Sequence, residues 1–190
     1  MEVTRRSFTA LTLATAGIAV ATPLLSRSAM AAEDPENTLY MDLKDGRVVI
    51  RLRPDMAPKT VARIKVLVRQ HFYDGLTFHR VIEGFMAQGG DPKGDGTGGS
   101  GQNIPAEFNA LKHERGTVSM ARAQDPDSAD SQFFICFTAV PDLDGQYTAF
   151  GQVVQGMEFV DKIKRGDPNN NGSVDSPDKI IKMQVAADAK

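Results

Sequence analysis

Apolar and polar residues alternate in short segments along most of the chain, which predicts strands. The clearest pair is 39–43 and 48–52, where apolar residues take every second position on both sides of Asp45-Gly46. An Asp-Gly pair between two alternating runs predicts a tight antiparallel hairpin. Further extended segments are predicted at 76–82, 85–88, 117–121, 132–137, 148–154 and 181–185.

Helical spacing appears in only two places. Apolar residues recur every three to four positions over 58–70, where Asp55 and Pro58 mark the start, and over 156–164, which Gly166 ends. Two helices so far apart do not indicate repeated β-α-β units. The pattern predicts a mainly β fold, a closed eight-stranded antiparallel β-barrel with an α-helix capping each open end.

Residues 1–31 have the layout of a bacterial export signal. A twin-arginine pair, Arg5-Arg6, precedes a mildly apolar run and the small-residue cleavage pattern Ala29-Met30-Ala31. We predict a cleaved signal of the twin-arginine type, a single domain over 32–190, and a periplasmic or secreted location. An uncleaved membrane anchor is the less favoured alternative, because the run is short and Pro23 interrupts it.

Composition excludes several classes of function. Removal of the signal takes three arginines and one glutamate away, so the net charge goes from −2 to −4. An acidic domain without a basic run argues against a nucleic-acid partner. The single cysteine, Cys136, lies in an apolar segment and is interpreted as a small buried hydrophobe. The histidines show no metal-ligand spacing, and no Ser-His-Asp or Cys-His arrangement is visible.

Two polar loops are candidates for ligand binding. Residues 89–102 hold seven glycines, but no GK[ST] motif or helix start follows, so we favour a loop that approaches a ligand or wraps the barrel edge over a phosphate cradle. Residues 167–178 carry oxygen side chains at loop positions 1, 3, 5, 9 and 12 with glycine at 6, as in a calcium loop. Asp at position 12 and a following strand favour a solvated connector instead.

Arg80 is the side chain whose position most needs an explanation. It lies within 78–82, an otherwise apolar segment apart from His79, with no acidic residue within two positions. A cation beside an apolar patch is unfavourable unless it is paired or has a role. One interpretation is a strand arginine paired with Glu83 or Glu107, and the other is a ligand-binding cation. Strand alternation predicts that His79 faces the opposite side and is structural.

Six linked segments resemble the cyclophilin family of peptidyl-prolyl isomerases, in that family's order and spacing. The resemblance covers essentially all of 38–185, and implies an eight-stranded barrel with two capping helices, cis/trans isomerisation of X-Pro bonds in peptides and unfolded proteins, and no cofactor. The segments are Phe78-His79-Arg80-Val81-Ile82, Gly84-Phe85-Met86-Ala87-Gln88-Gly89-Gly90-Asp91, Gly96-Thr97-Gly98-Gly99, Ser119-Met120-Ala121, Ser131-Gln132-Phe133-Phe134-Ile135 and Leu143-Asp144-Gly145.

The resemblance also implies roles for individual residues. Arg80 would be the catalytic cation. The proline pocket would be lined by Phe85, Met86, Phe134 and Leu143, with Tyr147 at its edge. The substrate backbone would meet Gln88 and Gln132, and would run past a rim formed by Ala121, Arg122 and Ala123. By composition alone, the aromatic and methionine side chains of this set would be assigned to the core.

Three residues depart from the family pattern. Arg122 replaces a common asparagine, Asp142 a common tryptophan and Tyr147 a common histidine. The last two are expected at the edge of the proline pocket, so we expect weakened affinity for cyclosporin-like macrocycles and retained isomerase activity in a monomer. Two functions stay open: an isomerase for exported proteins, and a peptide-binding chaperone whose turnover is incidental. The presence of Arg80 favours the isomerase.

Overall fold

The computed structural model describes Met1 and residues 34–189. Apart from Met1, the predicted export signal lies outside the described residues. No helix in the described part of the chain is long and apolar enough to cross a membrane. The strands and α-helices are β1 Thr38–Leu43, β2 Gly46–Leu52, α1 Pro58–Arg69, β3 Arg80–Ile82, β4 Met86–Gly89, β5 Thr117–Met120, β6 Phe133–Cys136, β7 Ala149–Gln155, α2 Met157–Val160 and β8 Lys182–Val185.

The predicted hairpin is confirmed as β1 and β2. Their antiparallel register closes on Leu43 opposite Gly46. A side chain at Gly46 would have no room, because its Cβ would lie 2.5 Å from the Phe159 ring. Glycine at this turn therefore lets α2 pack directly against the hairpin.

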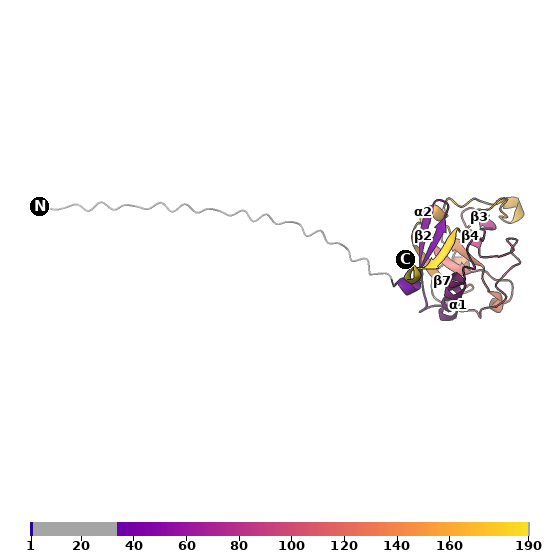
Figure 1. Cartoon of the computed structure of the whole chain (residues 1–190), viewed down its shortest axis with the longest axis horizontal. Helices are drawn as coiled ribbons and strands as arrows, with labels where there is room; N and C mark the ends of the chain where they lie inside the picture. Colours follow the sequence, from indigo (N-terminus) through magenta and orange to yellow (C-terminus); the bar gives the residue numbers. More distant parts are fainter. Residues whose placement is uncertain (2–33, 190) are drawn as a thin grey trace. The chain divides into compact units, whose positions relative to one another are not determined.

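The second helix is shorter than the predicted 156–164. After Val160 the backbone bonds change from the helical i to i+4 pattern to i to i+3, with Lys162 N–H on Phe159 O at 3.2 Å and Ile163 N–H on Val160 O at 3.1 Å. The segment therefore continues as hydrogen-bonded turns. Figure 1 shows α1 and α2 on opposite sides of the strands.

The eight strands form one antiparallel sheet in the order β3-β4-β6-β5-β7-β2-β1-β8. Strands β3 and β8 do not pair with each other in the described residues, so the predicted closure is not confirmed and the sheet is a curled half-barrel. Between these edges the described residues form isolated bridges, Thr77 to Lys179 and Arg80 to Ser173, and separate backbone hydrogen bonds in place of a continuous ladder. The segment before β8 contains Pro177, which cannot donate to a strand ladder.

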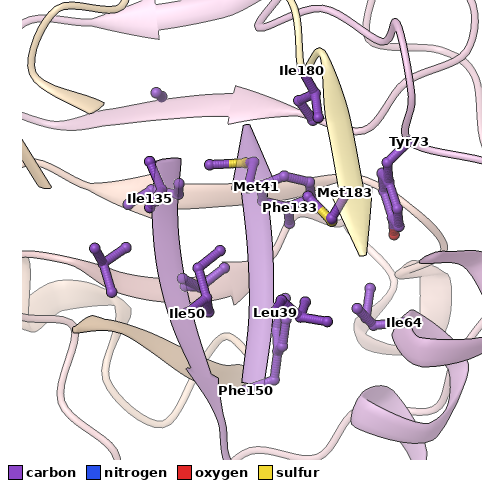
Figure 2. Packing of buried hydrophobic residues seen from close by; sticks show 14 of the residues in the cluster. Leu39, Met41, Ile50, Ile64, Tyr73, Phe133, Ile135, Phe150, Ile180 and Met183 are labelled. Carbon is purple, nitrogen blue, oxygen red and sulfur yellow. The ribbon is translucent and has the colours of Figure 1, made fainter. Parts of the chain in front are cut away.

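Alternate side chains of the strands build the main core. On β1, Leu39 and Met41 are buried, whereas Tyr40 between them is only half-buried. Figure 2 shows Leu39 of β1 beside Ile50 of β2, with Met41 farther along β1 and Ile64 on α1 nearby. The amphipathic face of α1 thus covers the inner face of the strands.

Glu107 caps the start of α1 in place of the predicted Asp55. Asp55 forms an ion pair with Arg53 at 2.7 Å. The Glu107 carboxylate instead accepts hydrogen bonds from the backbone N–H groups of Lys59 at 2.9 Å and Thr60 at 2.8 Å. These N–H groups have no partner within the helix, so a distant acid satisfies them.

Candidate active site

Every site residue predicted from the sequence lines one of two adjoining cavities. The small cavity has a volume of about 100 Å³ and is lined by Arg80, Phe85, Met86, Gln88, Ala121, Arg122, Phe134, Leu143 and Tyr147. The rim cavity, of about 340 Å³, shares Gln88, Ala121 and Arg122 with it. Ala123 and Gln132 line the rim cavity only. The structure thus brings together residues from four separate parts of the chain.

Strand register places the central residues in one row across the sheet. Arg80 of β3 lies opposite Gln88 of β4, Gln88 lies opposite Phe134 of β6, and Phe134 lies opposite Ser119 of β5. Met86 is two residues before Gln88 and therefore faces the same side. A cation, an amide and an aromatic ring are thus set side by side by backbone pairing alone.

A second apolar cluster, separate from the main core, forms the floor of the small cavity. Its buried members are Met86, Phe134 and Cys136, and Phe85, Leu143 and Tyr147 are among those packed against them. Cys136 is fully buried, as predicted, and burial raises the pKa of its thiol to about 12. The thiol therefore stays protonated and acts as a small apolar group.

Phe134 is held from both sides. Its ring meets Tyr147 edge-on at 5.9 Å between ring centroids, and stacks on His113 at 6.1 Å. His113 is itself fixed, because Nδ1 lies 3.1 Å from Asp144 Oδ1 and Nε2 lies 3.0 Å from Ser119 Oγ. A hydrogen-bonded chain of Asp144, His113 and Ser119, on the same face of the sheet as Phe134, therefore supports the aromatic wall of the small cavity.

This chain is a Ser-His-Asp arrangement that the sequence did not reveal. No short motif joins its members, since His113 and Asp144 lie 31 positions apart. Both lie outside the strands, and the two segments meet where Val140 N–H donates to His113 O at 2.7 Å. Ser119 has no exposed surface, and His113 is 2% exposed. A hydroxyl with no access to substrate cannot act as a nucleophile, so the arrangement is structural.

Arg80 has only neutral hydrogen-bond partners in the described part of the chain. Nη1 donates to Gln88 Oε1 at 3.1 Å, Nε donates to Asn171 O at 3.0 Å, and Nη2 donates to Asn171 Oδ1 at 3.0 Å. The two acids proposed as its partners are engaged elsewhere, Glu83 with Arg165 and Glu107 at α1. The interpretation of an ordinary ion-paired strand arginine is therefore wrong.

The guanidinium of Arg80 is half-buried, which lowers its pKa from the ordinary value. It stays protonated, since free arginine titrates far above neutral pH. Three of its five N–H groups are used by Gln88 and Asn171. Two N–H groups remain for a ligand at the wall of the small cavity.

Two glutamines extend the polar network from Arg80. Because Arg80 can only donate, Gln88 must accept through Oε1, and its Nε2 then donates to Gln132 Oε1 at 2.9 Å. Gln132 Nε2 in turn donates to the carbonyls of Gly96 at 3.0 Å and Gly98 at 2.8 Å. The orientation of both amides follows from this sequence of donors and acceptors.

The glycine-rich loop is organised by a buried acid. Asp91 is 1% exposed and accepts from the backbone N–H groups of Lys93 at 2.8 Å and Gly96 at 2.6 Å. Its carboxylate thereby folds the loop back so that Gly96 and Gly98 reach Gln132. This supports the interpretation that the loop brings backbone to the edge of a ligand site.

Two of the departures from the family pattern contact each other. The Arg122 guanidinium lies over the Tyr147 ring at 4.6 Å from its centroid, and Nη2 donates to Gln146 O at 3.1 Å. The cation is thus folded along the rim. The third departure, Asp142, is exposed and lines neither cavity.

His79 does not lie opposite Arg80 as predicted. Both line a third, outer cavity of about 460 Å³, together with Asp95, Asn170 and Asn171. The alternation does not reach His79, because β3 begins at Arg80. His79 is 7% exposed, and burial lowers its pKa, which favours the neutral ring and a structural role.

Two of the three acids in 167–178, the loop that resembles a calcium loop, accept hydrogen bonds from backbone N–H groups. Asp167 accepts from the backbone N–H of Asn169 at 2.8 Å, and Asp178 accepts from that of Lys164 at 2.8 Å. Among the described residues, no three His, Cys, Asp or Glu side chains gather as metal ligands would. These contacts support the connector interpretation of 167–178.

Comparisons with known proteins agree with this geometry. The family described as cyclophilin type peptidyl-prolyl cis-trans isomerase/CLD matches residues 38–185. A probable peptidyl-prolyl cis-trans isomerase of Brucella suis is 56% identical over 172 residues, covering 84% of this chain and 88% of that protein. Peptidyl-prolyl cis-trans isomerase B of Bacillus subtilis is 48% identical over 133 residues, covering 68% of this chain and 92% of that protein.

Solved structures show the same fold. A cyclophilin of Hirschia baltica matches with a TM-score of 0.74 at 26% identity, over 83% of this chain and 76% of that one. A cyclophilin type isomerase of Cryptosporidium parvum, crystallised in the presence of the dipeptide Ala-Pro, matches with a TM-score of 0.71 at 29% identity, over 78% and 98%. The fold and the matched region thus define a cyclophilin-type domain. The chain belongs to the cyclophilin-type peptidyl-prolyl cis-trans isomerases, and it is an isomerase enzyme.

Asp144 makes stability depend on pH. The backbone N–H of His113 is the main cause that holds the pKa of Asp144 at about 2, below its ordinary 3.8. Between about pH 4 and pH 2 this carboxylate is ionised in the folded protein, whereas in the unfolded chain it binds a proton. Its contribution to the free energy of unfolding is therefore fully present above about pH 4 and is lost as the pH falls toward 2. We predict that urea-unfolding free energies of wild type and Asp144→Asn differ at pH 5 and converge near pH 2.

The matched control for this experiment is Asp142→Asn, an exposed change two residues earlier. A gap between wild type and Asp144→Asn that stays constant from pH 5 to pH 2 would contradict the assignment.

Proposed function

We propose that Arg80 accelerates rotation about X-Pro bonds by stabilising the twisted prolyl amide, whose proline ring occupies the small cavity. The observation that carries the proposal is a charged guanidinium whose hydrogen-bond partners among residues 34–189 are all neutral, at the wall of an apolar cavity. Phe85, Met86 and Phe134 supply the apolar contacts. Gln88, Gln132 and the rim residues are proposed to contact the substrate backbone.

The rotational barrier of the X-Pro amide sets how much transition-state stabilisation the enzyme must provide. An amide rotates across about 18–20 kcal/mol because nitrogen shares its lone pair with the carbonyl. The uncatalysed change at X-Pro takes tens of seconds or more. A turnover of ~10–10³ s⁻¹ requires a reduction of roughly 4–7 kcal/mol. No covalent bond needs to break, so the reaction requires no nucleophile.

In this proposal, two physical effects together lower the barrier by an amount of this order. The small cavity removes water from the amide, which weakens the charge-separated resonance form. As the amide twists, the lone pair localises on the prolyl nitrogen and can accept a hydrogen bond. A free N–H of Arg80 donates to it in the transition state and much less in the planar ground state, which is the condition for a higher kcat.

The substrates we propose are proline-containing peptides and unfolded exported proteins. The Cryptosporidium parvum relative crystallised in the presence of Ala-Pro supports the peptide class. We propose weak binding of cyclosporin-like macrocycles, because Tyr147 and Arg122 together occupy the edge where the family pattern has smaller polar groups. We propose a monomer, because the large apolar side chains exposed in 34–189 come from four separate segments of the chain, with Val66 in α1, Phe108 in a loop, Val154 in β7 and Ile181 just before β8.

Removal of the guanidinium should abolish most of the activity. We predict that Arg80→Ala lowers kcat/KM for a proline peptide by about 10²–10³-fold, the scale seen when a transition-state donor is lost. Arg80→Lys should recover only part of the activity, because a point charge lacks the planar fork. The rate is measured by peptide isomerisation and by proline-limited refolding, with unfolding curves to verify the fold.

The control is Arg47→Ala, which removes an arginine from the β1–β2 hairpin and should leave the rate unchanged. Equal rates for wild type and Arg80→Ala would leave only a peptide-binding chaperone, the alternative function.

We also propose that the protein is exported through the twin-arginine route and acts in the periplasm or outside the cell. Arg5-Arg6, the apolar run and Ala29-Met30-Ala31 support this proposal. Replacement of Arg5-Arg6 by lysines is predicted to retain the full-length chain in the cytoplasm. Cell fractionation and the mass of the mature chain measure the outcome. Equal export of both forms would contradict the route, and an uncleaved membrane-bound chain would indicate an anchor.

A further inference from the structure

We propose that Asn171 is a positioning residue that sets the orientation of the Arg80 guanidinium for catalysis. The inference rests on the proposed role of Arg80. It concerns a segment, 167–178, that lies outside the motifs carrying the family resemblance. Asn171 accepts two of the three hydrogen bonds that Arg80 donates, one through its backbone O and one through Oδ1, both at 3.0 Å.

These two bonds fix the plane of the guanidinium. Nε and Nη2 lie on one edge of the fork, and both meet Asn171, while Nη1 donates to Gln88. Three bonds in two directions leave the planar group little freedom to rotate. The two remaining N–H groups are thereby held in a constant direction, which catalysis by a donor requires.

The loop that carries Asn171 is attached to β3 on both sides of Arg80. Val81 N–H donates to Gly172 O at 2.8 Å, and Val174 N–H donates to His79 O at 3.0 Å. Gly172 permits this contact, because a Cβ there would lie 2.4 Å from Ile82 Cγ1. The position of Asn171 is therefore coupled to the strand that presents Arg80.

The backbone at Asn171 explains why an asparagine suits the position. Its φ is 50° and its ψ 29°, the left-handed region in which asparagine is tolerated far better than most residues. Loop closure by Gly172 N–H on Asp167 O at 2.8 Å holds this turn. Asparagine also adds a neutral acceptor, so it orients Arg80 without neutralising its charge.

Two substitutions distinguish the contribution of the Asn171 side chain from that of its backbone. Asn171→Gly keeps the left-handed turn and the backbone acceptor but removes Oδ1, and it should lower kcat about three- to tenfold with KM little changed. Asn171→Ala also strains the turn and should lower kcat further. The control is Asn170→Ala, an exposed neighbour on the same outer cavity to which Arg80 donates none of its three hydrogen bonds within 34–189.

The outcomes distinguish the positioning role of Asn171 from the proposed catalytic role of Arg80, on which it rests. The expected result is a loss in kcat for Asn171→Gly, faster NMR-detected motion of the Arg80 Nε–H group, a cooperative unfolding transition that shows an intact fold, and no further loss when the change is made in Arg80→Ala. Wild-type kcat in Asn171→Gly, with Arg80→Ala inactive, would overturn the inference and leave the proposed function intact. Full activity in Arg80→Ala would overturn the proposed function itself.

Discussion

The structure of this site depends on one arrangement, a guanidinium held by neutral acceptors beside an apolar cavity. Half-burial of Arg80 without a carboxylate is unfavourable for folding, since the charge loses water and gains no opposite charge. Gln88 and Asn171 offset part of that cost through hydrogen bonds. Because neither partner is charged, the cation remains available for the role we propose, donation to a group that becomes electron-rich only during rotation of the amide.

The rest of the fold serves to hold this arrangement. Antiparallel register sets Arg80, Gln88 and Phe134 in one row, so their spacing is determined by backbone pairing. Phe134 is then fixed by His113 beneath it. Glu107, one of the two acids considered from the sequence as a partner of Arg80, instead accepts hydrogen bonds at the start of α1. The strand pairings β3–β4 and β4–β6 that stabilise the sheet thus also fix the spacing of the proposed site residues.

Much of this could be predicted from the sequence, because alternation, the Asp-Gly turn and the glycines are local signals. All eight strands appear where such signals lie, and the site residues gather as the family resemblance implied. The open edge of the sheet between β3 and β8 was not predictable, since it depends on the irregular segment before β8. The Ser119-His113-Asp144 chain and the contact of Asn171 with Arg80 also escaped prediction, because each joins residues that are distant in sequence and have no characteristic spacing.

The most direct test of the central claim is the kcat of Asn171→Asp. Aspartate keeps the size, the tolerance of the left-handed turn and the acceptor for Arg80, and it adds only a negative charge. If the uncompensated charge of Arg80 drives amide rotation, kcat should fall tenfold or more, on the order expected for a weakened transition-state donor, while the protein stays equally or more stable. A kcat equal to or above that of wild type would contradict the account.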